Sequence, residues 1–168
     1  MNLTEYYGQP AEGEMVLVLG TDIMEERALK SGDQIYLPQD IVSTYLNQRY
    51  YWDSGNQQIL YATPSSLEKF PASEAGDGEV WVRDGKVYLS LSLVQKYTDL
   101  DFYEYQEPAR VVIRHEFTGV NVATVKKDTS IRYRGGIKSP VLTEVKKGDT
   151  LIYMQALEDW VQVSTMDG

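Results

Sequence analysis

The apolar and polar positions of the chain repeat with a period of 52 residues. Residues 28–61 align with residues 80–113 without a gap. The positions that stay identical or similar at this offset are apolar or aromatic: Tyr36/Tyr88, Leu37/Leu89, Val42/Val94, Tyr45/Tyr97, Tyr51/Tyr103, Ile35/Val87, Ile41/Leu93, Tyr50/Phe102, Ile59/Val111, Leu60/Val112 and Tyr61/Ile113. A fixed period of this length indicates one supersecondary motif used twice. Because the charged residues are not repeated, the pattern favours a scaffold over an enzyme.

Each copy predicts a hairpin, a helix and a second hairpin. The first hairpins turn at Ser31-Gly32-Asp33 and at Asp84-Gly85, between alternating apolar residues. Gly-containing turns in this setting are a hairpin signal. The second hairpins turn at 53–56 and at Gln106-Glu107-Pro108.

A helix is predicted between the two hairpins of each copy. Pro38 suits the first helical position, and Ser90 is an N-cap candidate in the second copy. The apolar stripe of the first helix comes from two i,i+4 pairs, Ile41/Tyr45 and Val42/Leu46.

The predicted fold class is therefore α+β. One ββαββ unit cannot bury both faces of its sheet, so the repeats 28–63 and 80–115 should pack together as one domain over residues 15–117. Residues 1–14 are polar and turn-prone, and we expect a linker there, in a segment of a longer protein.

The rest of the chain, residues 118–168, predicts only short strands separated by turns, which is typical of a small barrel. The chain stops at Asp167-Gly168, a turn signal with no strand after it. We expect a barrel without its last strand, whose open edge exposes unpaired backbone groups.

Charge is distributed unevenly between these two regions. Residues 118–168 hold seven of the 16 Lys and Arg and six of the 25 Asp and Glu, a balance of +1 within the net charge of −9. Residues 1–117 therefore carry −10, which supports a domain boundary near residue 118. Such an acidic region opposes binding to nucleic acid or to anionic membranes.

Several kinds of chemistry are excluded or disfavoured. The chain has no cysteine, which excludes disulfides, thiolate metal sites and thiol catalysis. His115 is the sole histidine, so a typical zinc or copper site has no ligand set. No apolar run approaches the roughly 20 residues that span a bilayer, and no signal-peptide layout is present. We expect no metal, no cofactor and no membrane insertion.

Acidic residues gather at Glu25-Glu26 and at Asp99, Asp101, Glu104 and Glu107. A glycosidase needs two carboxyl groups across a cleft, one of them with a raised pKa. Nothing in these two clusters indicates burial, and solvated loops are the simpler interpretation. No phosphate-binding loop or nucleophile elbow is present, so we assign no catalytic residue.

Residues of the C-terminal region resemble the bacterial SH3-like domain. The resemblance rests on an arginine strand, a Ser-Pro loop, a Lys-Lys-Gly turn and a Trp-x-x-Val segment: Ile131-Arg132, Ser139-Pro140-Val141-Leu142, Val145-Lys146-Lys147-Gly148-Asp149 and Trp160-Val161-Gln162-Val163. The chain departs from the family at 133–137, in the loop that borders the family's usual ligand groove. The family's final strand has no counterpart here.

The duplicated region resembles the copper amine oxidase N-terminal-like domain, a non-catalytic stalk module. The resemblance rests on 32–38, on the amphipathic helix and on Tyr51-Trp52-Asp53, whereas the second copy has Glu104 in place of Trp52. A stalk followed by an SH3-like domain is similar to the N-terminal half of bacterial cell-surface family 18 glycosidases. This resemblance implies a chain that is not itself an enzyme, within a parent protein that carries the catalytic domain.

Aromatic side chains are the candidates for ligand binding, because they can stack on sugar rings. Most rings in the repeats recur in both copies, which favours core packing. Trp52 and Tyr105 break the repeat and are expected to be more exposed, and Tyr133, Tyr153 and Trp160 could line a groove in the barrel. In the family that it resembles, Trp160 would instead belong to the core.

The resulting prediction is an extracellular or cell-surface accessory region that positions or targets an attached cell-wall or glycan-active enzyme. Its partners would be peptidoglycan or another wall glycan, and the catalytic domain of the parent protein. The alternative is a structural spacer that docks on its own catalytic domain. An independent hydrolase that uses acidic residues is the remote alternative.

Overall fold

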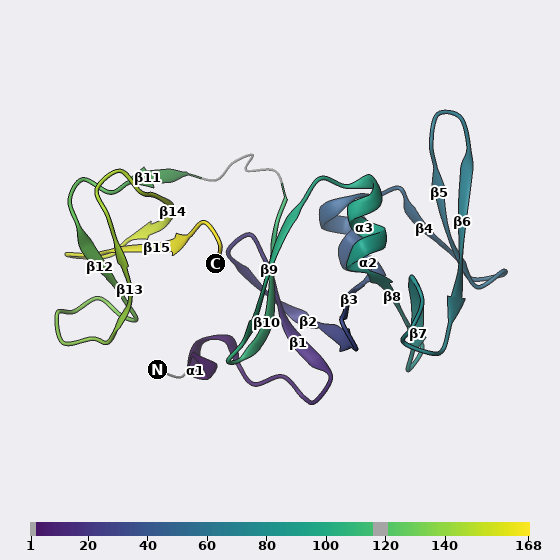
Figure 1. The fold of residues 1–168 in the computed structure, drawn as a ribbon, viewed down its shortest axis with the longest axis horizontal. Coiled ribbons are helices and arrows are strands. Elements are labelled where there is room, and N and C mark those ends of the chain that lie inside the picture. Colours follow the sequence, from purple (N-terminus) through teal and green to yellow (C-terminus); the bar gives the residue numbers. More distant parts are fainter. Residues whose placement is uncertain (1–2, 116–120) are drawn as a thin grey trace.

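The computed structural model describes residues 3–115 and 121–168 and is dominated by β-strands (Figure 1). Strands account for 51% of the residues and helices for 12%. The helical segments are short: α1 (Thr4–Tyr7), α2 (Gln39–Ile41), its continuation η1 (Val42–Leu46) and α3 (Leu91–Tyr97). The predicted α+β class is therefore wrong. The segments α2, η1 and α3 cover only the middle of a long sheet, and the strands make up most of the fold.

The large sheet has ten strands in the order β4-β5-β6-β7-β8-β3-β2-β1-β10-β9. From one edge to the other their bounds are β4 (Tyr50–Asp53), β5 (Gln58–Ala62), β6 (Leu67–Ser73), β7 (Val80–Arg83), β8 (Lys86–Ser90), β3 (Gln34–Pro38), β2 (Asp22–Ser31), β1 (Glu14–Leu19), β10 (Ala109–Arg114) and β9 (Asp101–Gln106).

The two copies exchange their second hairpins within this sheet. Copy one contributes β2 and β3 to one half of the sheet and β4 and β5 to the other, and copy two does the reverse. The halves meet where β3 pairs with β8, and Leu37 lies opposite Leu89. These two residues are equivalent at the 52-residue offset, so an approximate two-fold axis passes between them. The folding unit is thus the interlocked pair of copies, and neither copy forms a separate ββαββ unit.

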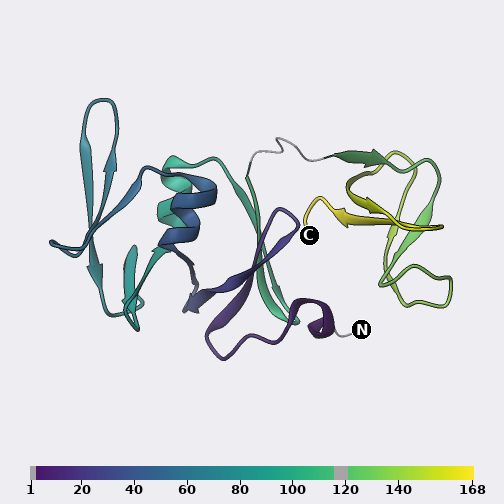
Figure 2. The ribbon, with the colours of Figure 1, turned by 180° about the vertical axis from the view of Figure 1, so that it is seen from behind.

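The main core lies between the sheet and the helical segments (Figures 1 and 2). The Ser90 hydroxyl caps α3 by accepting a hydrogen bond from the Leu93 backbone N–H. Tyr50 is fully buried, and its hydroxyl donates to the carbonyl oxygens of Leu93 and Val94. Burial raises the pKa of Tyr50, because the core cannot solvate the charged phenolate.

The first helix departs from the predicted stripe. Its second half is η1, a π-helical turn in which the Asn47 N–H bonds to the carbonyl oxygen of Val42. The wider turn leaves Tyr45 57% exposed, while Ile41 and Val42 stay buried. The predicted Ile41/Tyr45 pair is therefore not formed in the core.

The C-terminal part forms two small sheets, β11-β14-β15 and β12-β13. Its strands are β11 (Val122–Thr124), β12 (Thr129–Arg132), β13 (Val141–Val145), β14 (Thr150–Ala156) and β15 (Val161–Thr165). In the described residues, β13 and β15 each pair along one edge alone. The expected boundary near residue 118 falls in 116–120, outside the described residues.

Candidate functional site

A groove lies between α1 and the 133–140 loop, which connects β12 to β13. Its volume is about 510 Å³. The residues that line it come from both ends of the described chain: Glu5, Tyr133, Arg134, Gly135, Gly136, Lys138, Ser139 and Pro140. It combines an aromatic ring, two cations and exposed backbone, which suits a polar ligand.

The shape of the 133–140 loop is fixed by hydrogen bonds around Ser139. Its hydroxyl accepts from the Arg134 backbone N–H at 2.9 Å, and its carbonyl oxygen accepts from Arg132 Nη1 at 2.8 Å. A Cβ atom on Gly135 would lie 3.0 Å from Cγ of Trp160. A side chain at 135 would press on the indole, so glycine lets the loop close over Trp160.

Charge in the groove centres on Arg134. Its Nη2 atom lies 2.8 Å from Oε1 of Glu5, and its guanidinium stands 5.3 Å from the ring centre of Tyr133. The two side chains of the ion pair are 68% and 70% exposed, so water reaches both. Tyr6, beside Glu5, has a raised pKa, because it is partly buried and lies near Tyr7 and Tyr133.

A ladder of rings and a guanidinium group anchors α1 on the sheet. The Arg110 guanidinium lies between two rings, 4.1 Å from the centre of Tyr105 and 4.6 Å from that of Tyr7. Tyr7 in turn meets Tyr6 edge to face at 4.8 Å. Cation–π contacts of a desolvated arginine are among the stronger ones. They place α1, and with it Glu5, at the groove.

A seam joins the C-terminal segment 164–168 to the outer face of β9 and β10. Arg114 donates from Nε to the carbonyl oxygen of Met166 and from Nη2 to that of Thr165, and the Tyr105 hydroxyl donates to that of Asp167. Burial lowers the pKa of Arg114. Among the described residues, neither Arg114 Nη1 nor Arg110 Nε finds a hydrogen-bond partner.

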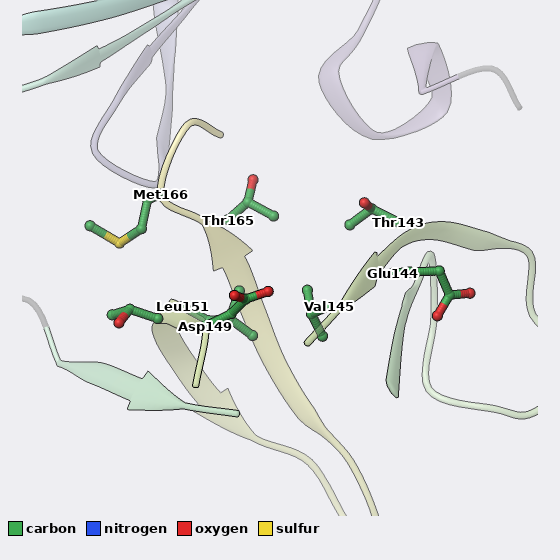
Figure 3. A pocket seen from close by; sticks show the side chains of 8 residues that line it. Thr143, Glu144, Val145, Asp149, Leu151, Thr165 and Met166 are labelled. Atoms are coloured by element: carbon green, nitrogen blue, oxygen red, sulfur yellow. The ribbon is translucent and has the colours of Figure 1, made fainter. Parts of the chain in front are cut away.

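A second cavity, of about 340 Å³, opens between β13 and the end of β15 (Figure 3). Two buried apolar side chains, Val145 and Leu151, line it together with polar residues that include Glu144, Asp149 and Thr165. The cavity holds no cation among its lining residues, so it offers a weaker polar site than the groove.

The structure brings together two of the five predicted ligand-binding residues. Tyr133 lines the groove, and Trp160 packs beneath its loop. Tyr153 is half-buried in β14 and does not line the groove. Trp52 is half-buried against the main core, and Tyr105 belongs to the seam.

The exposed ring of the Tyr50–Trp52 segment is Tyr51, at 65%, rather than Trp52. Sequence reasoning missed Glu5, Arg134 and Lys138. The signal for the two cations was present, because residues 129–143 contain three basic residues and no acidic one.

The residues that could suggest catalysis or metal binding are dispersed. Nδ1 of His115 lies 2.9 Å from the carbonyl oxygen of Asp99, and Glu104 pairs with Lys30 at 2.7 Å. Residues 3–115 and 121–168 contain no group of three or more His, Cys, Asp or Glu side chains placed to hold a metal ion. Within the same ranges, no helix has the length and hydropathy to cross a membrane.

No protein-family model matches the chain, and no curated protein or solved structure is significantly similar to it.

Proposed function

We propose that this chain is a non-catalytic, cell-surface accessory region that holds a wall-binding groove in a fixed orientation. The groove of the C-terminal part would bind peptidoglycan or another wall glycan, and the ten-stranded sheet would set its position relative to an attached enzyme. The observation that carries this proposal is the seam, which fastens the C-terminal part to the sheet.

The seam favours a fixed orientation because two side chains of the sheet hold the C-terminal segment 164–168. Arg114 donates to the carbonyl oxygens of Thr165 and Met166, and Tyr105 donates to that of Asp167. Gly168 also lies against Val112, where a Cβ atom would come within 2.9 Å of the valine methyl carbons. Several contacts along one short segment restrict rotation of the C-terminal part more than a single contact would.

The groove favours a sugar ligand because of its composition. Tyr133 offers an aromatic ring, and Arg134 and Lys138 offer donors for hydroxyl and acidic groups. Sites for small ligands usually combine one hydrophobic surface with a few polar groups that fix orientation.

Co-sedimentation with purified bacterial cell walls tests the proposal. We expect the protein to sediment with the walls, and Tyr133→Ala to lower its retention about tenfold through loss of the aromatic contact surface. Tyr45→Ala is the matched control, because Tyr45 is 57% exposed on η1 and distant from the groove in sequence. Absence of retention on every wall preparation would refute the binding role.

A second candidate function is docking on a catalytic domain of the parent protein. Tyr51 and Leu67 are 65% and 53% exposed on the same outer face of β4–β6, which suits a protein partner. Comparing the activity of the parent protein with that of a Tyr51→Ser variant tests this role. Equal activity and equal localisation would count against it.

A further inference from the structure

We propose that the groove recognises a carboxylate-bearing sugar, and that Glu5 occupies the position of the ligand's carboxylate. This inference rests on the proposed function and specifies its ligand. It assigns Arg134 as the residue that binds the acidic group of the sugar. Glu5, in the N-terminal segment, then competes with that group for Arg134.

The first observation is the Glu5–Arg134 ion pair. It joins residues 129 positions apart in sequence, with an Nη2–Oε1 distance of 2.8 Å. Both side chains are about two-thirds exposed, and ion pairs of this kind contribute little to stability. Glu5 can therefore leave Arg134 without unfolding the protein, and another carboxylate can take its place.

The second observation is the charge around the groove. The chain carries −9, yet residues 129–143 hold Arg132, Arg134 and Lys138 and no acidic residue. Arg132 is committed to the Ser139 carbonyl oxygen, which leaves Arg134 and Lys138 facing the groove. A locally basic site on an acidic protein attracts small anions and repels polyanions that span both regions.

The third observation is the placement of Tyr133 beside Arg134. The guanidinium lies 5.3 Å from the ring centre, so an apolar surface and a fork of donors adjoin each other. Guanidinium groups bind carboxylates through two parallel hydrogen bonds, which lysine cannot reproduce. A sugar ring on Tyr133 would place an acidic substituent on Arg134.

Heteronuclear NMR titration of the full chain with two matched sugars tests the inference. N-acetylmuramic acid carries a lactyl carboxylate that N-acetylglucosamine lacks. We expect N-acetylmuramic acid to bind about tenfold more tightly, with shifts at Arg134 and Gly136, because its carboxylate can replace Glu5 on Arg134 through two parallel hydrogen bonds, whereas N-acetylglucosamine has no group that can. Added salt should reduce this preference.

Two substitutions separate the competing role of Glu5 from the ligand-binding role of Arg134. Glu5→Gln removes the competing charge and should tighten N-acetylmuramic acid binding about two- to fivefold. Arg134→Gln should abolish the preference for the acidic sugar. Lys127→Gln, an exposed lysine outside the groove, is the charge control and should leave both affinities unchanged. Circular dichroism verifies that each variant is folded.

The outcomes distinguish this inference from the proposed function. Equal affinity for the two sugars, or no gain from Glu5→Gln, would overturn the carboxylate assignment even if cell walls still retain the protein. Tighter binding of inorganic phosphate than of N-acetylmuramic acid would overturn it as well. Loss of wall retention in every preparation would instead refute the proposed function.

Discussion

We call β4-β5-β6-β7-β8 the first half of the sheet and β3-β2-β1-β10-β9 the second half. Their outer faces are built from equivalent strands, but only the outer face of the second half is covered. In the second half, Val112 is 1% exposed beneath Gly168. In the first half, its equivalent Leu60 is half-buried, and the neighbouring Tyr51 is 65% exposed, whereas Tyr103 is half-buried. The same arrangement of strands is covered in one half and open in the other.

Side chains that differ between the copies account for this difference. Arg114 and Tyr105 hold the C-terminal segment, and their equivalents at the 52-residue offset are Ala62 and Asp53. Neither an alanine methyl nor a carboxylate can donate a hydrogen bond to a backbone carbonyl oxygen at neutral pH. The repeated residues thus build the sheet, and the unrepeated ones decide what binds to it.

The largest expected effect comes from placing a charge on each face. Val112→Lys would bury a further cation between Arg110 and Arg114, which lie on the same face of β10, and should cost at least about 3 kcal/mol of unfolding free energy. Leu60→Lys places the same charge on the open face, where water solvates it, and should cost much less. Urea denaturation measures both. Equal losses would mean that the two faces are equally covered.

Arg114→Met should release the C-terminal segment while the sheet stays folded. Methionine keeps apolar volume but loses the donors to Met166 and Thr165, and it removes a buried cation without a carboxylate partner. Hydrogen exchange at Gly168 should accelerate at least about tenfold. Ala62→Met is the matched control and should leave exchange at Gly168 unchanged. Unaltered exchange in both variants would show that Arg114 does not hold the segment.

Tyr105→Phe removes one hydrogen bond of the seam and should cost about 1 kcal/mol. Burial, followed by Asp167, raises the pKa of Tyr105, so the folded state favours the neutral phenol. The contribution of the Tyr105 phenol to folding stability is complete below its ordinary pKa near 10 and is lost as pH rises through the raised pKa. Thermal melts between pH 8 and 11 should show a smaller alkaline loss for the variant.

Tyr51→Phe is the control for that substitution, because the Tyr51 ring is exposed and should contribute almost nothing. A Tyr51→Phe loss as large as that of Tyr105→Phe would contradict the assignment of the seam to the second half.

The smallest expected effect concerns Glu26 and Asp40, a carboxyl pair found in one copy only. Burial, followed by a hydrogen bond that the protonated Glu26 carboxyl donates to Asp40, raises the pKa of Glu26, while Lys86 opposes this shift. The raised pKa makes the protonated form stabilising, so this contribution is complete below the ordinary value near 4.5 and is lost as pH rises through the raised pKa.

Glu26→Gln should therefore raise the Tm at pH 7 by about 1 °C, a small gain because solvent screens a partly exposed pair, and leave it unchanged at pH 4. Glu25→Gln on the exposed neighbour is the control. Equal shifts for the two variants would mean that only net charge matters.

Much of the local structure could be predicted from the sequence. The Asp84-Gly85 turn connects β7 to β8, Ser90 caps α3, and the second hairpin of each copy follows its helix. These features depend on neighbouring residues, so local chemistry is sufficient to predict them. The fold class was not predicted correctly, because the extent of the sheet depends on how distant hairpins pair.

The candidate site was predicted in part. Tyr133 and Trp160 were identified from their aromatic character; Tyr133 lines the groove, whereas Trp160 packs against Gly135 beneath the loop. Glu5 could not be connected with them, because the ion pair joins the two ends of the chain. The copies differ at Trp52, which made it a candidate, yet the side chains that hydrogen-bond to the C-terminal segment are Tyr105 and Arg114.

The sequence alone determined the duplication, the turns and the apolar pattern, because each follows from residues close together in the chain. The tertiary structure decided that the copies exchange hairpins about the Leu37–Leu89 pair, and that the same face is covered in one half and open in the other. It also decided that Tyr51, and not Trp52, is the exposed aromatic ring of residues 50–52. These outcomes depend on contacts between residues 40 to 130 positions apart, and no periodicity in the sequence specifies such contacts.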